Sequence, residues 1–233
     1  MSKKGLLISF DGLDSSGKAT QVRELIRRLE TIGHRVHHFQ TPDYNTPSGQ
    51  ELKLRLQGKL GDWPATPWEQ KMKYFAQNRA EHKDEVVAAL KAGDIVVYDR
   101  YVPSSLAFIA TEALTAQEID LYRVKLYKAV RREEYKKQGM PQEHVSIFLD
   151  VPPRVALALL AKRKTVHQQD DEYTDHRLVQ ERLYNEYDYM SRQKPEQWLR
   201  IKCVEGTELL GIEEVAELIW DGLTQRFTEL HKK

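Results

Sequence analysis

The sequence has one cysteine and no long hydrophobic run, and both absences narrow the class of protein. Cys203 has no second cysteine with which to form an internal disulfide, which is typical of a reducing compartment. No apolar run approaches the roughly 20 residues that cross a bilayer, and the first residues lack the apolar core of a signal peptide. We therefore expect a soluble, cytoplasmic protein with no membrane partner.

The chain also lacks an excess of charge of either sign. It carries 36 basic and 35 acidic residues among 233, which gives a net charge of +1 at pH 7. This balance argues against nucleic acid or a membrane surface as the main partner, but it is compatible with a small basic pocket for a substrate. The length suits one sizeable core, so we expect residues 1–233 to form a single domain.

The sequence does contain a strand, a glycine-rich loop and a helix in direct succession, in residues 6–23 (LLISFDGLDSSGKATQVR). Gly12 and Gly17 allow successive backbone N–H groups to face inward, and the following helix adds its positive N-terminal end. Lys18 is placed to reach the β- and γ-phosphates of a nucleotide. We therefore predict an ATP-binding loop made of Gly12, Leu13, Asp14, Ser15, Ser16, Gly17, Lys18, Ala19 and Thr20.

One position of this loop departs from the phosphate-binding motif. The motif places Ser or Thr after the lysine, where its hydroxyl binds Mg²⁺, whereas this chain has Ala19 there and Thr20 next. Thr20, a water molecule or a carboxylate from elsewhere must then complete the Mg²⁺ shell. The departure leaves open a second hypothesis, in which the protein binds a nucleotide without catalysis because it holds Mg²⁺ poorly.

Strands and helices alternate along the rest of the chain. Apolar runs predict four more strands, at residues 36–39, 95–98, 145–150 and 199–204. Helical patterns cover residues 49–57, about 66–90, 115 to near 139, 154–161, 178–190 and 212–227. This alternation predicts an α/β fold with three layers, in which helices cover both faces of a five-stranded parallel sheet.

Two of these helices carry capping patterns at their predicted starts. Thr66-Pro67-Trp68-Glu69 combines an N-cap threonine, a proline at the first helical position and a glutamate at the third. Thr115-Ala116-Gln117-Glu118 repeats the threonine and glutamate spacing. The stretch after the helix at 154–161 is dense in charge and has no apolar period, so we expect a basic surface loop, or lid, over roughly residues 162–174.

The remaining polar residues favour phosphoryl transfer. Asp99 and Arg100 follow the strand at residues 95–98, where burying charge without a purpose would be expensive. Arg163 lies at the centre of the basic lid. Phosphoryl transfer is catalysed mainly by positioning two anions in line and neutralising the moving charge, and a closed lid excludes water. The Asn-Lys-x-Asp signature of GTPases is absent, so a small-molecule kinase is favoured.

Several segments resemble the thymidylate kinases, a family of P-loop nucleoside monophosphate kinases. The segments are the loop at residues 10–18, the Pro42-Asp43 turn, Tyr74-Phe75-Ala76-Gln77-Asn78-Arg79, and Asp99-Arg100-Tyr101 followed by Ser104 and Phe108. The resemblance implies the P-loop kinase fold and transfer of the ATP γ-phosphate to dTMP, which gives dTDP and ADP. It also implies Mg²⁺ as the cofactor and a homodimer formed through packed helices.

The resemblance also implies a role for each matching residue. Phe75 would stack on the thymine ring, and Arg79, one helical turn later on the same face, would donate to a base carbonyl oxygen. Arg100 would hold the acceptor phosphate, and Asp99 would hold Mg²⁺ directly or through water. A core phenylalanine and a structural ion pair are the alternative interpretations of Phe75 and Arg100.

Other matches concern the sugar and the edge of the base. Asp14 would lie near the sugar 3′-hydroxyl, Ser104 beside the pyrimidine edge, and Phe108 near the 2′ position, where its bulk excludes a ribose hydroxyl. Tyr173 and Gln180 match acceptor-side residues. The implied dTMP site comprises Asp14, Pro42, Phe75, Arg79, Arg100, Ser104, Phe108, Tyr173 and Gln180, and the implied catalytic set comprises Lys18, Asp99, Arg100 and Arg163.

Two positions depart from the family. Some members carry an arginine inside the phosphate loop, where this chain has Ser15; members without it use a lid arginine, which makes Arg163 the candidate here. Many members follow the Pro-Asp turn with an arginine that contacts the acceptor phosphate, where this chain has Tyr44. Tyr44 therefore keeps open a kinase for another deoxynucleotide or for a nucleoside.

The lid hypothesis predicts the kinetics of Arg163→Ala. An arginine that stabilises the transferring phosphoryl group acts in the transition state, so its loss should lower kcat far more than it raises KM for the acceptor. Initial rates of ADP release, measured at saturating ATP across a range of dTMP concentrations, give both constants. Wild-type kcat in this variant would contradict the lid assignment.

Overall fold

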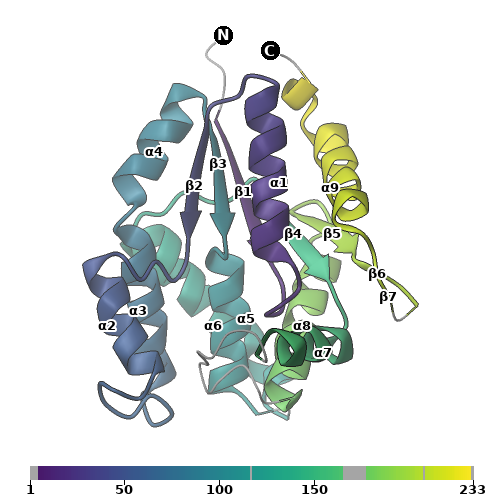
Figure 1. The fold of residues 1–233 in the computed structure, drawn as a ribbon. Helices are drawn as coiled ribbons and strands as arrows, with labels where there is room; N and C mark the ends of the chain where they lie inside the picture. The colour runs from purple at the N-terminus through teal and green to yellow at the C-terminus, as the bar shows by residue number, and fades with distance from the viewer. Residues whose placement is uncertain (1–4, 116, 165–176, 207, 232–233) are drawn as a thin grey trace.

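A computed structural model describes residues 5–115, 117–164, 177–206 and 208–231. Its centre is a parallel five-stranded sheet with the strand order β2-β3-β1-β4-β5 (Figure 1). The strands are β1 (Leu6–Asp11), β2 (Val36–Gln40), β3 (Ile95–Asp99), β4 (Val145–Asp150) and β5 (Trp198–Lys202). This architecture confirms the predicted α/β fold class.

The three inner strands explain why the sheet forms. Every residue of β1 and β4 is buried, as are the first four of β3, as continuous apolar runs in a sheet covered on both faces require. The register places Phe10 of β1 opposite Asp99 of β3 on one side and Ile147 of β4 on the other. Because all strands run in the same direction, their carboxyl ends meet at one edge, where ligands bind in such sheets.

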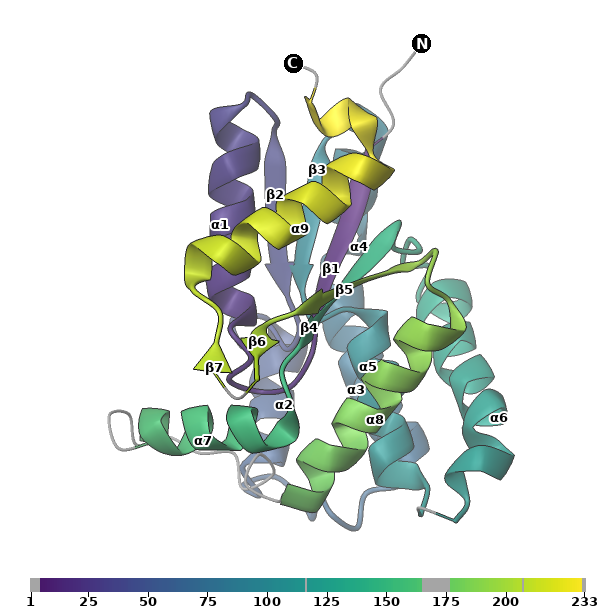
Figure 2. The ribbon, with the colours of Figure 1, turned by 90° about the vertical axis from the view of Figure 1, so that its right-hand side faces the viewer.

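Helices cover both faces of the sheet. Helices α1 (Lys18–Thr31) and α9 (Ile212–Arg226) lie on one face, where Val22 and Ile219 share a core with Ile8 (Figure 2). Helices α4 (Lys83–Ala92), α5 (Val102–Ala113) and α8 (Arg177–Gln193) cover the other face, against side chains such as Leu7 and Phe148. Helices α2 (Pro47–Leu56), α3 (Trp68–Ala80), α6 (Ile119–Arg131) and α7 (Pro153–Lys164) lie towards the carboxyl ends of the strands.

The single helix predicted from Thr66 to about Leu90 is wrong. The structure has two helices, α3 and α4, separated by Glu81 and His82. The His82 ring packs on Phe39 with centroids 5.1 Å apart, and its Nε2 lies 3.0 Å from Asp43 Oδ2, so contacts with the end of β2 bend the chain there. The predicted cap is wrong too, since Thr66 donates to the Asp62 carbonyl and Pro67 occupies the N-cap position.

The hydrogen bonds expected between Thr115 and Glu118 form, but α6 begins later than predicted, with Glu118 as its N-cap, and it also ends differently. The Thr115 amide donates to Glu118 Oε2 at 2.9 Å, and the Glu118 amide donates to Thr115 Oγ1 at 3.3 Å, as in a capping box. Helix α6 then passes into a π-helix, η1 (Arg132–Lys137), which the sequence pattern did not predict. The sequence pattern also did not predict α5 or the hairpin formed by β6 (Val204–Glu205) and β7 (Glu208–Leu209). A 3-10 helix, η3 (Thr228–His231), follows α9.

The start of the predicted lid is helical. Helix α7 continues beyond Ala161 to Lys164, so residues 162–164 are the last turn of a helix rather than a loop. Residues 165–174 of the predicted lid, with Tyr173, lie outside the described residues. Across the part of the chain that the structure describes, no helix is both long and apolar enough to cross a bilayer. Cys203 follows β5 and is buried, and burial raises the pKa of its thiol to about 12, as expected of an unreactive core cysteine.

Candidate active site

The phosphate loop joins β1 to α1 at the carboxyl edge of the sheet. Gly12 and Gly17 have φ angles of 141° and 90°, a region that side chains rarely adopt. A Cβ on Gly12 would also lie 3.0 Å from the Leu149 carbonyl oxygen, so glycine is required there. Gly17 is the N-cap of α1 and provides no side chain to cap it, which leaves N–H groups of the first turn for an anion.

Lys18 is folded over this loop. Its Nζ donates to the carbonyl oxygens of Gly12 at 3.1 Å and Leu13 at 2.6 Å. Burial, together with the positive charge of Arg100, lowers the pKa of Lys18 to about 8 although Asp14 and Asp99 oppose the shift. The ammonium group therefore loses its proton at a lower pH than an ordinary lysine does.

A cavity of about 480 Å³ lies beside the loop, and its wall contains most of the predicted ATP-binding residues. The wall comprises Asp14, Ser15, Gly17, Lys18, Ala19, Thr20, Arg23, Asp99, Arg100 and Leu159. Ser15 Oγ is buried and has no hydrogen-bond partner among the described residues, so a ligand can satisfy it. We call this space the donor cavity.

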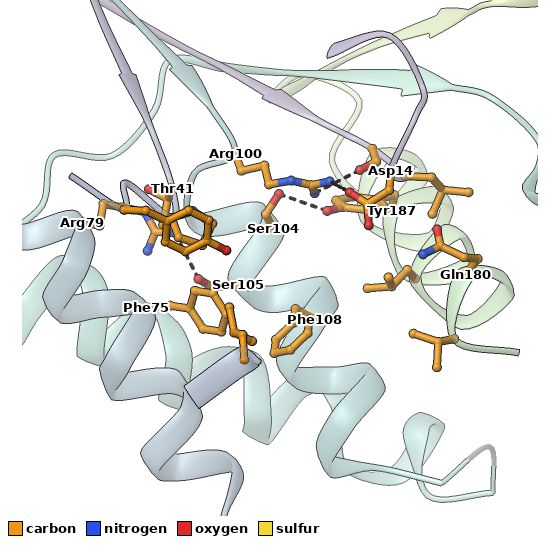
Figure 3. Close-up of a pocket in the computed structure, with 17 residues that line it drawn as sticks. Asp14, Thr41, Phe75, Arg79, Arg100, Ser104, Ser105, Phe108, Gln180 and Tyr187 are labelled. Carbon is orange, nitrogen blue, oxygen red and sulfur yellow. Dashed lines mark hydrogen bonds and ion pairs between the residues drawn. The ribbon is translucent and has the colours of Figure 1, made fainter. Parts of the chain in front are cut away.

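A second cavity, of about 160 Å³, lies between the loop and helices α3, α5 and α8 (Figure 3). Eight of the nine residues of the implied dTMP site line it, namely Asp14, Pro42, Phe75, Arg79, Arg100, Ser104, Phe108 and Gln180. Thr41 and Tyr44 also line it, and Thr41 Oγ1 is a buried hydroxyl without a partner in the described chain. We call this space the acceptor cavity.

Aromatic rings form one wall of the acceptor cavity. Phe75 is half-buried and meets Phe108 edge to face, with centroids 5.1 Å apart. Trp63, from the segment between α2 and α3, packs edge to face with Phe75 with centroids 6.2 Å apart, and it is 2% exposed. Phe75 is therefore held from two sides with part of its surface open to the cavity, as stacking on a base requires. Nothing in the local sequence pattern indicated Trp63.

Arg100 and Asp14 line both cavities and form an ion pair where the cavities meet. Arg100 Nη1 also donates to the Gly12 carbonyl at 3.2 Å. Burial alone would raise the pKa of Asp14, but the charges of Arg100 and Lys18 hold it below its usual value. Arg100 has a φ of 64°, a strained conformation for a non-glycine residue that is characteristic of functional sites.

Ser104 and Ser105 point to different partners. The Ser104 hydroxyl donates to buried Asp11 at 2.7 Å and lies 3.0 Å from the Tyr187 hydroxyl, while Ser9 donates to the other oxygen of Asp11 at 2.8 Å. The Ser105 hydroxyl instead accepts from Arg79 at 3.2 Å. Ser105 and Tyr187 are thus site residues that the sequence did not indicate, and only the position of Ser105 next to Ser104 could have suggested it.

The residues fit Mg²⁺ held with a nucleotide. Mg²⁺ usually takes one or two carboxylates and completes its shell with phosphate oxygens and waters. Asp99 lines the donor cavity with Lys18 and Thr20. Asp99 can therefore serve as the protein ligand of Mg²⁺, directly or through water, although residue 19 is an alanine and provides no hydroxyl.

These features define a class of protein. A glycine-rich phosphate loop at the carboxyl edge of a parallel sheet, opening into a second cavity through a shared arginine, is the arrangement of a P-loop nucleotide kinase. The family model described as thymidylate kinase matches residues 10–213. The chain therefore belongs to the thymidylate kinase family.

Individual relatives agree with this assignment. The chain is 30% identical over 223 residues to a thymidylate kinase from Synechococcus sp., a match that covers 95% of both chains. It is 33% identical over 160 residues to a thymidylate kinase from Xanthomonas euvesicatoria, and that match spans 62% of the relative's length. A solved thymidylate kinase structure from Candida albicans superposes with a TM-score of 0.70 at 20% identity, covering 98% of this chain and 94% of that one, and supports the fold.

The state of Lys18 gives a pH prediction. A lysine binds phosphate as a cation, and a pKa near 8 means that its protonated fraction falls as the pH rises through that value. The affinity of the free enzyme for ATP should therefore decrease between pH 7 and pH 9, by about tenfold for each pH unit above the pKa. Calorimetric titration with ATP at constant ionic strength measures this.

The matched control is Lys18→Met, which should bind ATP weakly at pH 7 and show no comparable decline. An ATP affinity of the wild-type protein that stays constant from pH 7 to pH 9 would contradict the role given to Lys18.

Proposed function

We propose that this protein is a nucleoside monophosphate kinase that transfers the γ-phosphate of ATP to dTMP, giving dTDP and ADP. The observation that carries the proposal is the junction of the two cavities at Arg100 and Asp14. Two phosphate-binding cavities that meet at one arginine suit an acceptor phosphate and a donor triphosphate placed end to end. Membership of the thymidylate kinase family supports dTMP as the acceptor.

The proposed reaction is a direct displacement. An oxygen of the acceptor phosphate forms a bond with the γ-phosphorus, and the bond between that phosphorus and the β–γ bridging oxygen breaks as ADP leaves. Lys18 and the loop N–H groups bind the β- and γ-phosphates. Arg100 releases the Asp14 carboxylate and binds the acceptor phosphate in its place. Mg²⁺, when bound with ATP, neutralises charge on the phosphates, and Asp99 is the residue proposed to hold it.

Arg163 is proposed to neutralise the moving phosphoryl group. It lies in the last turn of α7, four residues after Leu159, which lines the donor cavity. Ser15 leaves no arginine inside the loop for this task. We further propose, from the family, that the enzyme acts in the cytoplasm as a homodimer.

Tyr44 favours a second acceptor. It lines the acceptor cavity, and the ammonium of Lys53 lies 5.8 Å from its ring centroid. Phosphate recognition therefore rests on Arg100 with less help from the Pro42-Asp43 turn, which would suit a nucleoside or another deoxynucleotide as acceptor. Base contacts from Phe75 and Arg79 remain the same for thymidine and dTMP.

An ADP-release assay with ATP and Mg²⁺ separates these possibilities. The acceptors dTMP, dUMP, dCMP, dGMP, UMP and thymidine are offered in parallel. We expect dTMP to give the highest kcat/KM. We expect UMP to be disfavoured, because Phe108 leaves little room for a 2′-hydroxyl. Lys18→Ala should abolish turnover with every acceptor. A preference for thymidine would establish the second acceptor, and no ADP release with any acceptor would support a non-catalytic nucleotide-binding protein.

A further inference from the structure

The acceptor cavity contains a cation that is buried before any ligand arrives. The Arg79 side chain is 1% exposed although Arg79 lines the cavity, and it forms an ion pair with Glu134, which is 0% exposed. The two residues come from different parts of the fold, because Arg79 belongs to α3 and Glu134 to η1. An arginine in the cavity wall is thus held by a carboxylate from behind the wall.

The π-helix provides this carboxylate. Inserted turns of this kind are rare and occur often at functional sites. In η1 the adjacent Glu133 and Glu134 are both buried, but they have different partners. Glu133 accepts from Lys137 at 2.7 Å within its own segment, whereas Glu134 accepts from Ser105 at 3.1 Å in addition to Arg79. Glu134 alone of the two connects η1 to the cavity wall.

The partners of Arg79 fix its guanidinium but do not use all of its donors. Nη1 binds Glu134, and Nη2 donates at 3.2 Å to both the Tyr101 carbonyl and Ser105 Oγ. Nε has no hydrogen-bond partner among the described residues. A guanidinium group has five N–H donors, so donor capacity remains beside the acceptor cavity. Figure 3 shows Arg79 and Ser105 on the same side of the cavity as Phe75.

Stability alone does not account for this pair. Replacing a buried ion pair by apolar residues of similar volume is often neutral or stabilising, whereas removing one partner leaves a costly buried charge. A fixed cation is, however, well suited to selecting a ligand, because a site built to donate hydrogen bonds disfavours a ligand that presents a donor at the same place.

We infer that Glu134 is a positioning residue for recognition of the acceptor base. It holds the Arg79 guanidinium, through Nη1 and through Ser105, so that a remaining N–H donates to a carbonyl oxygen on the edge of a pyrimidine. A pyrimidine with an amino group at that edge places its own N–H donor against the Arg79 N–H donor, so its binding is disfavoured. This inference rests on the proposed function and adds to it the carboxylate that holds Arg79 in place for base recognition.

The test compares Glu134→Gln with Glu133→Gln, a matched control from the same buried turn. For Glu134→Gln we expect KM for dTMP to rise roughly tenfold or more with kcat within about threefold of wild type, because a charged hydrogen-bonding partner of Arg79 is lost. The ratio of kcat/KM between dTMP and dCMP should fall by a similar factor. Glu133→Gln should change neither quantity. A KM and a ratio equal to those of wild type, or an equal loss for both nucleotides, would overturn the inference.

A second comparison applies where Glu134→Gln does not fold. The variant Arg79→Gln removes the cation alone. The double variant, Arg79→Gln with Glu134→Gln, removes the cation together with its carboxylate partner. If Glu134 acts through Arg79, the two variants have the same KM for dTMP, since the second change has nothing left to position. A further tenfold increase in the double variant would overturn the inference.

Calorimetric binding of dTMP and dCMP without ATP separates this inference from the proposed function. Failure of the proposed function appears as absence of phosphoryl transfer by the wild-type protein. The inference fails independently if Glu134→Gln binds dTMP and dCMP with the wild-type preference.

Discussion

The ion pair between Arg100 and Asp14 is the interaction on which the geometry of the site depends. Arg100 follows β3 directly, and its amide donates to the Phe10 carbonyl at 2.9 Å, which fastens it to the end of β1. Its φ of 64° costs about 1–3 kcal/mol for a non-glycine residue, a strain that the surrounding sheet must sustain. The result is a guanidinium at the junction of the donor and acceptor cavities, held by a carboxylate of the phosphate loop.

Buried polar groups beneath this pair connect the elements that carry it. Asp11 is fully buried, and burial raises its pKa although the Ser104 and Ser9 hydroxyls both donate to it. Ser104 in turn lies within hydrogen-bond distance of Tyr187, so the Asp11 carboxylate and the Ser104 hydroxyl together join β1, α5 and α8. On the other side of the cavity, Glu134 and Ser105 hold Arg79. Both walls of the acceptor cavity are thus fixed by carboxylates that belong to the protein, and the cavity is preorganised for its ligand.

Local patterns were sufficient to predict the sheet and the phosphate loop, because apolar runs and glycine positions are local signals. They failed where a distant contact decides the outcome. The break between α3 and α4 depends on His82 meeting Asp43, and the ion pair of Arg79 joins residues 55 positions apart. Phe75 and Arg79 could be placed together from their helical spacing, whereas Trp63, Ser105 and Glu134 reach the site only through tertiary packing. The role of Arg163 remains a prediction.

The most direct measurement is calorimetric titration of Arg100→Met with dTMP and, separately, with ATP. The matched control is Arg28→Met, whose arginine pairs with Glu217 between α1 and α9. Loss of a charged donor to phosphate should weaken dTMP binding by roughly thirtyfold while changing ATP affinity by less than about threefold, and phosphoryl transfer should be lost. An unchanged affinity for dTMP, or an equal loss for both ligands, would contradict the account of Arg100 as the residue that presents the acceptor phosphate to the donor.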